Sequence, residues 1–129
     1  MNKTILSVAA LLGFLTVAIG AFGAHGLEKL VAADDLATFE TGVKYQMYHT
    51  LVLLFLGIVP VLTEKTKKTL FYLFLSGIIL FSGSIYGLAT NELSSFNFKS
   101  IGFVTPIGGT LLLIGWGIMF YKFIKLKTK

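Results

Sequence analysis

The stretch TILSVAALLGFLTVAIGAFGA, from Thr4 to Ala24, carries no charged residue. A hydrocarbon core about 30 Å thick is crossed by about 20 residues of helix, so this stretch predicts a membrane-spanning helix. Three further apolar runs of similar length follow it. They show no strand-like alternation, and a spanning segment must satisfy its own backbone groups. We therefore predict an all-α fold, a single domain over residues 1–129 that forms an integral membrane bundle of four transmembrane helices, at about 4–24, 43–62, 70–89 and 101–124.

The composition supports a membrane protein. Hydrophobic residues make up 55% of the chain and charged residues 13%, against roughly a quarter charged in soluble domains. The chain has no cysteine, which excludes disulfides, thiolate nucleophiles and thiolate metal sites. The net charge of +5 comes from lysines at the edges of the apolar runs rather than from a basic stripe, so we expect no binding to nucleic acid.

The lysines also predict an orientation. Most of them lie near the N-terminus, in the turn TEKTKKT at 63–69, or in the C-terminal tail that ends at Lys129. Lysine-rich connections remain in the cytoplasm, which predicts that both termini are cytoplasmic. The first apolar run also resembles a cleaved signal peptide, but its uninterrupted length favours a retained anchor.

Two helix boundaries have particular sequence signals. Asp34 or Asp35 is suited to cap a short helix that lies in the outer interface and turns into the membrane at Gly42. Thr105-Pro106 is compatible with a helix that starts at Pro106 and with one that runs through and kinks there.

Small residues at four-residue spacing predict close helix contacts, because lipid provides no hydrophobic drive for helices to associate. Such residues occur on the first, third and fourth runs. The glycines assigned to helix packing are Gly13, Gly20, Gly83, Gly87 and Gly109.

Polar residues gather where the predicted helices meet the outer side. Because buried polar groups in a membrane are costly unless they are paired or used, we interpret them as a candidate site. The candidate polar cluster contains His25, Glu40, Lys44, Tyr45, Gln46, His49, Tyr86 and Thr105.

His49 has two well-separated candidate roles. It fits a buried histidine that hydrogen-bonds a neighbouring helix, and it also fits a proton relay or a haem or metal ligand, with His25 as a second ligand. Neither H-x-x-x-H nor H-E-x-x-H occurs, so we predict no metal site and no cofactor.

Four motifs, in order, match one family. They are GAFGAHGL at 20–27, FETGVKYQMYH at 39–49, FSGSIY at 81–86, and TPIGG at 105–109 followed by Gly115-Trp116. The chain thereby resembles the domain-of-unknown-function 423 family, small membrane proteins similar to the transmembrane protein 256 group. This resemblance implies a multi-pass protein of the bacterial cytoplasmic (inner) membrane, and it implies no activity.

The sequence contains no G-x-S-x-G elbow and no phosphate-binding glycine loop, so we expect no enzyme. The leading hypothesis is a non-catalytic accessory or interaction component in the lipid bilayer, with a membrane protein partner or further copies of itself. The alternatives are a small oligomeric transporter or channel, and a redox protein that binds haem or quinone through His25 and His49.

Overall fold

The computed structural model describes residues 2–127, and Lys129, which contributed to the predicted orientation, lies outside them. The described chain is helical and contains no strand, which confirms the predicted all-α class. Short 3-10 turns occupy the two longer connections. The long helices are α1 (Asn2–His25), α2 (Ala33–Ile58), α3 (Glu64–Ala89) and α4 (Val104–Ile124), and the turns are η1 (Leu27–Lys29), η2 (Asn91–Leu93) and η3 (Phe98–Ile101).

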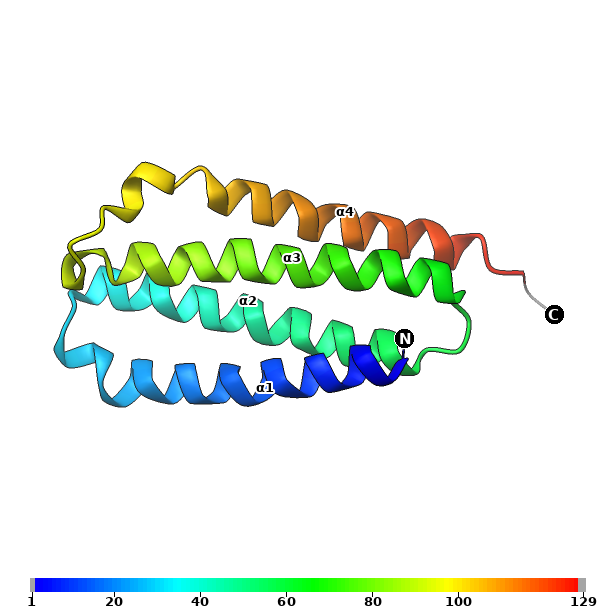
Figure 1. Ribbon diagram of the computed structural model, residues 1–129, viewed down its shortest axis with the longest axis horizontal. Coiled ribbons are helices and arrows are strands. Elements are labelled where there is room, and N and C mark those ends of the chain that lie inside the picture. The colour runs from blue at the N-terminus through cyan, green and yellow to red at the C-terminus, as the bar shows by residue number, and fades with distance from the viewer. Residues whose placement is uncertain (1, 128–129) are drawn as a thin grey trace.

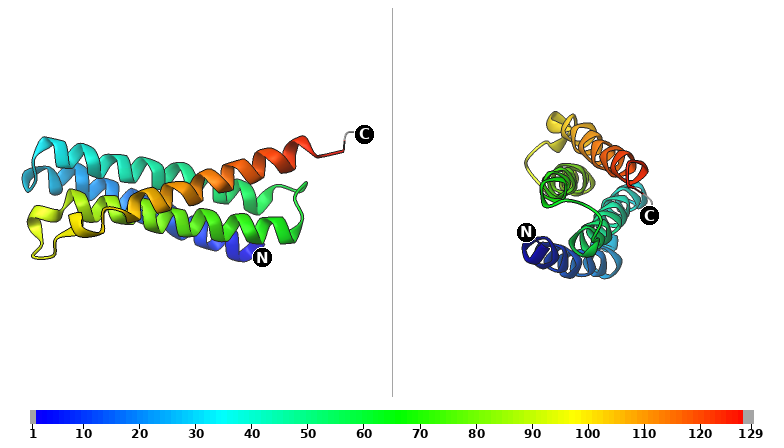
Figure 2. Two further views of the ribbon diagram at one scale, coloured as in Figure 1. Left: turned by 90° about the horizontal axis from the view of Figure 1, so that it is seen from above. Right: turned by 90° about the vertical axis from the view of Figure 1, so that its right-hand side faces the viewer.

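The four long helices run side by side in alternating directions (Figure 1). Both termini lie at one end of the bundle, together with the α2–α3 turn, and the other two connections lie at the opposite end. Helix α2 packs between α1 and α3, while α4 packs mainly along α3 (Figure 2). The arrangement places the lysine-rich segments at the same end of the molecule, the end that the sequence analysis predicts to be cytoplasmic.

Three segments are long and apolar enough to cross a bilayer, namely Asn2–Lys29, Glu64–Ala89 and Phe98–Ile124. Helix α2 is as long as α3 but is more polar in its first half. Three of its uncharged polar side chains, Gln46, His49 and Thr50, are buried inside the bundle, while Glu40 and Lys44 are exposed. The neighbouring helices therefore cover these three polar side chains, and the whole forms a helical membrane bundle.

The boundaries of α2 differ from the predicted 43–62. The helix begins at Ala33 and continues without a break through Gly42, so a separate interfacial helix that turns at Gly42 was wrong. It ends at Ile58, and Val59 is extended, with a ψ of 124°. The residue before a proline is disfavoured in the helical region, so Pro60 stops the helix earlier than its apolar run predicts.

Helix α3 begins at Glu64 rather than at 70, because Thr63 caps it: the Thr66 backbone N–H donates to Thr63 Oγ1 at 3.2 Å. Helix α4 begins at Val104, three residues after the predicted 101 and two before the alternative start at Pro106. Pro106 lies in the first turn, where the missing N–H breaks no intrahelical hydrogen bond.

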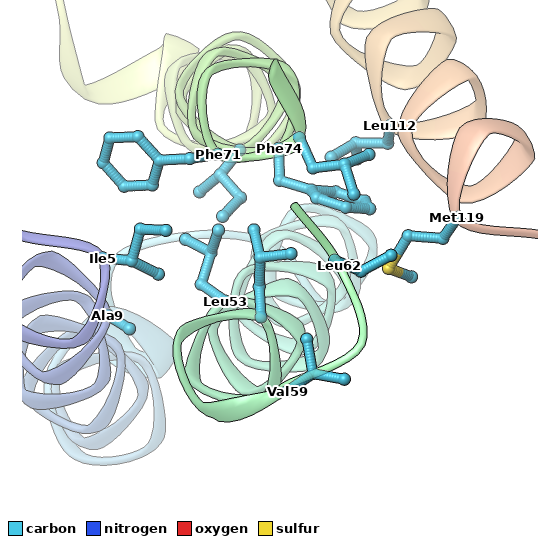
Figure 3. Close-up of a cluster of buried hydrophobic side chains, with 12 residues drawn as sticks. Ile5, Ala9, Leu53, Val59, Leu62, Phe71, Phe74, Leu112 and Met119 are labelled. Atoms are coloured by element: carbon cyan, nitrogen blue, oxygen red, sulfur yellow. The ribbon is translucent and has the colours of Figure 1, made fainter. Parts of the chain in front are cut away.

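Two apolar clusters form the core, one toward each end of the bundle. The larger lies toward the end that holds the termini and joins all four helices (Figure 3). The smaller contains Leu27, Phe39 and Ala89, near the η1 connection. Between the clusters lie buried polar side chains, which we call the polar layer: Thr16, Gln46, His49, Thr50 and Ser82.

Close approach of α3 and α4 depends on glycines that the sequence analysis did not select. A Cβ at Gly108 would lie 2.4 Å from the backbone nitrogen of Phe81, and a Cβ at Gly77 would lie 2.6 Å from Leu112. Backbone atoms cannot move aside as a flexible side chain can, so the requirement for glycine is stricter at Gly108 than at Gly77.

The glycines predicted to pack helices have different surroundings. A Cβ at Gly83 would have nothing within 4 Å, so the prediction that Gly83 packs a helix was wrong. Gly87 contacts Phe98 in the η3 connection rather than a long helix. Ordinary van der Waals neighbours of other helices lie 3.4–3.7 Å from a Cβ built at Gly13, Gly20 and Gly109. These three positions lie at helix interfaces but do not demand glycine.

Candidate functional site

His49 lies in the polar layer, near the middle of α2, and joins α2 to α4. Its side chain is 5% exposed. The Trp116 indole N–H donates to His49 Nε2 at 3.0 Å. Because an indole can only donate, Nε2 is an acceptor and the proton of the neutral imidazole lies on Nδ1. Nδ1 then donates to the Tyr45 carbonyl oxygen at 2.7 Å.

Aromatic rings surround this histidine. Phe74 of α3 lies 5.9 Å from the His49 ring and Trp116 lies 6.0 Å from it, as distances between ring centroids. Trp116 was not among the predicted site residues. A signal was present, because it is the only tryptophan of the chain and stands inside an apolar run. A buried indole N–H usually has a hydrogen-bond partner, and His49 was a candidate at similar depth.

A second polar contact joins α2 to α3. The Tyr86 hydroxyl donates to Gln46 Oε1. One turn away, the Ser82 hydroxyl donates to the Gly42 carbonyl oxygen at 2.8 Å. A Cβ at Gly42 would lie 2.7 Å from the Tyr86 ring. Gly42 therefore allows the helices to approach closely enough for both hydrogen bonds, rather than forming the turn predicted from sequence.

The remaining predicted cluster residues lie apart from His49. Thr105 joins α4 to α3 by a hydrogen bond between its hydroxyl and that of Ser84. Glu40 and Lys44 are exposed and line a shallow hollow of about 190 Å³ between α1 and α2. His25 is exposed at the end of α1. The structure thus divides the predicted cluster into separate groups and places Gln46 and His49 near mid-length of α2 rather than at its outer end.

His25 and His49 do not form a pair. A Cβ at Gly23 would lie 2.7 Å from Phe39, and Phe39 precedes His49 by ten residues, about 15 Å along a helix. His25 lies beyond Gly23, still farther from His49, because α1 and α2 run in opposite directions. The two imidazoles cannot ligate one iron in this arrangement. In residues 2–127, no group of three or more His, Cys, Asp or Glu side chains is placed to hold a metal ion.

A groove of about 930 Å³ opens beside His49, between α2 and α4, and Phe81 of α3 also lines it. We call it the α2/α4 groove. Aliphatic and aromatic side chains form most of its surface. It is lined by Tyr45, Tyr48, His49, Leu51, Val52, Phe81, Pro106, Gly109, Thr110, Leu112, Leu113 and Trp116.

The buried polar groups are already paired inside the bundle. Within the described part of the chain, every buried side-chain nitrogen and oxygen has a hydrogen-bond partner. The lone pair of His49 that a metal or a substrate proton would need is occupied by the Trp116 N–H. These contacts suit polar residues that hold helices together, which is one of their established uses in membranes.

Comparison with known proteins identifies relatives along the whole chain. A UPF0382 membrane protein of Haemophilus influenzae is 42% identical over 128 residues, 99% of each chain. The UPF0382 inner membrane protein YgdD of Escherichia coli K12 is 40% identical, covering 99% of this chain and 95% of its own. A Staphylococcus saprophyticus UPF0382 membrane protein is 41% identical over 88% of this chain and 91% of its own.

No solved structure matches the chain. The family model described as "Protein of unknown function (DUF423)" matches residues 19–109, which include three of the four motifs in full and the fourth up to Gly109. Together with the relatives, this match confirms the resemblance found in the sequence: the chain is a multi-pass membrane protein and belongs to the DUF423 family.

Proposed function

We propose that the protein is a non-catalytic accessory component of the bacterial cytoplasmic membrane, and that its α2/α4 groove receives a hydrophobic partner molecule. The pairing of the buried polar side chains inside the bundle carries this proposal. A general base or nucleophile needs a free lone pair within reach of a substrate, and both nitrogens of His49 are in use.

The geometry supports this function over the alternatives. A redox centre with two histidine ligands needs His25 and His49 together, but His25 lies at the end of α1 and His49 near mid-length of α2, far from it along the bundle axis. A carrier of ions or protons needs a polar path through the bundle. Instead, the large apolar cluster that joins all four helices lies between the polar layer and the end that holds the termini.

Native mass spectrometry of the intact protein released from detergent micelles tests the proposal. We expect the masses of bare chains and of chains that carry lipid. Each chain can appear by itself, with a protein partner or with further copies of the same chain. His49→Ala should lower the thermal stability in detergent without removing a haem or metal mass. A haem or metal adduct that disappears in His25→Ala or His49→Ala would overturn the proposal, and so would proton or ion flux in proteoliposomes.

A further inference from the structure

The shape of the α2/α4 groove limits what can occupy it. Along α4 it extends from Pro106 to Trp116, which is about 15 Å of helix. Beyond Trp116 side chains of the two helices meet, with the ring centroids of Phe55 and Phe123 6.3 Å apart. A partner transmembrane helix is about 30 Å long in the hydrocarbon core. The groove is too short for such a helix and suits a single flexible chain.

The surface of the groove also selects its occupant. Its walls are largely hydrocarbon, and apart from the phenols of Tyr45 and Tyr48 the polar side chains that line it are engaged. His49 Nε2 accepts from Trp116 at 3.0 Å, and the Thr110 hydroxyl donates to the Pro106 carbonyl at 2.8 Å. Away from these two tyrosines, a polar headgroup would find no free partner in the groove. The volume of about 930 Å³ lies within the range of roughly 300–1,000 Å³ that ligand sites occupy.

Free polar groups lie at one end of the groove. Tyr45 and Tyr48 are 41% and 53% exposed, and within residues 2–127 neither phenol hydroxyl has a protein hydrogen-bond partner. Lys44 is exposed and precedes Tyr48 by four residues, so both lie on one face of α2. Long helical side chains lean toward the helix N-terminus, which for α2 is the end opposite the termini.

Glu40 is the charged group that competes for this lysine. It precedes Lys44 by four residues and lines the same shallow hollow between α1 and α2. Such a pair at an exposed interface stabilises by a few tenths of a kcal/mol, less than an anion that also accepts from two phenols. Lys44 therefore remains able to bind a phosphate, with Glu40 weakening that attraction.

We infer that the α2/α4 groove binds a phospholipid, with one acyl chain in the groove and the phosphate at Lys44, Tyr45 and Tyr48. This inference rests on the proposed function and adds the class of the hydrophobic partner. The lipid lies in the leaflet nearer the α1–α2 connection. No covalent step is involved, and the protein acts as a lipid-binding component.

Trp116, the only tryptophan, provides the readout, because it lines the groove. Bromine on an acyl chain quenches indole fluorescence on contact. The full-length protein in detergent is titrated with phosphatidylglycerol that carries brominated chains. We expect quenching that saturates, and several-fold weaker binding of the uncharged diacylglycerol with the same brominated chains.

Matched variants locate the lipid. Gly109→Leu places a side chain in the groove, since a Cβ there has only ordinary contacts, the nearest at 3.5 Å. Gly117→Leu on the same helix faces open space, with nothing within 4 Å of its Cβ. We expect Gly109→Leu to abolish saturable quenching and Gly117→Leu to preserve it. Unfolding of each variant in detergent, followed by circular dichroism, verifies that both remain folded.

The headgroup is tested separately. Lys44→Gln should weaken binding of phosphatidylglycerol about three- to five-fold, the effect of one exposed ion pair, while Lys99→Gln in the η3 connection should leave it unchanged. Quenching that never saturates, or that persists in Gly109→Leu, would overturn the inference. Equal binding of phosphatidylglycerol and diacylglycerol would also overturn it. The quenching results would also remove the hydrophobic partner proposed for the groove. None of these results affects the non-catalytic role, which fails only if a haem or metal adduct or ion flux is found.

Discussion

Replacement of Trp116 by phenylalanine tests the hydrogen bond between α2 and α4 that the polar layer depends on. The change removes the indole N–H that donates to His49 Nε2 at 3.0 Å. Trp116 is 46% exposed, because one side of its ring faces the groove, so the loss of packing is small. His49 is 5% exposed and would retain an acceptor without a partner.

The expected cost follows from these contacts. An unpaired buried polar group costs about 1–3 kcal/mol, while interhelical hydrogen bonds in membranes average about 0.6 kcal/mol and reach about 1.7. Because Nδ1 keeps its bond to the Tyr45 carbonyl, only one side of the ring is affected. We therefore expect Trp116→Phe to lower the free energy of unfolding by about 1 kcal/mol.

The assay is unfolding by SDS in mixed micelles, followed by circular dichroism because the variant lacks its fluorophore. Phe120→Leu, at a position 68% exposed on the same helix, controls for the loss of an aromatic ring. A double-mutant cycle with His49→Leu isolates the pair, since no acceptor is then stranded. Equal costs of Trp116→Phe with His49 and with Leu at position 49 would refute the hydrogen bond.

Three further predictions concern packing, pairing and orientation. Gly108→Ala should lower the free energy of unfolding by more than about 2 kcal/mol, since its Cβ would lie 2.4 Å from the α3 backbone. Gly83→Ala should be neutral or stabilise by up to about 1 kcal/mol through helix propensity. Unfolding by SDS measures both. Tyr86→Phe strands the buried Gln46 carbonyl and should cost about 1 kcal/mol, which Gln46→Leu in the same chain should partly restore. The protein has no cysteine, so a single introduced cysteine reports its own side of the membrane. Ser95→Cys should react with an impermeant maleimide added outside intact cells, while a cysteine in the α2–α3 turn should react only after lysis. The reverse pattern would contradict cytoplasmic termini.

Local sequence was sufficient for the class of the fold. The apolar length of each run predicts its helix, because a membrane-spanning segment must satisfy its own backbone and be hydrophobic along its whole length. The predicted ends of the helices were less accurate where an apolar run and the helix that contains it do not begin and end at the same residues. Helix α2 begins in a polar stretch, at Ala33, and stops at Ile58 although the apolar run continues to Leu62.

Pairing between helices was decided by the tertiary structure. His49, Gln46 and Tyr86 are recognisable as unusual in the sequence, because a polar side chain inside a membrane needs a partner. Which partner each one has depends on helix rotation and crossing, and so Trp116 was missed as the donor to His49. Gly83 and Gly108 are indistinguishable as glycines in apolar runs, yet one faces open space and the other touches the α3 backbone.

The sequence by itself therefore determined that the protein is a membrane protein, how many long helices it has and which polar residues need a partner. These properties follow from the free energy of transfer of each segment into lipid. The tertiary structure alone decided that α4 contacts α2 at His49 and leaves a groove beside it, bounded by Tyr45 and Trp116. A groove is a property of the distance between two surfaces. That distance is set by side chains far apart in the chain, which no local pattern records.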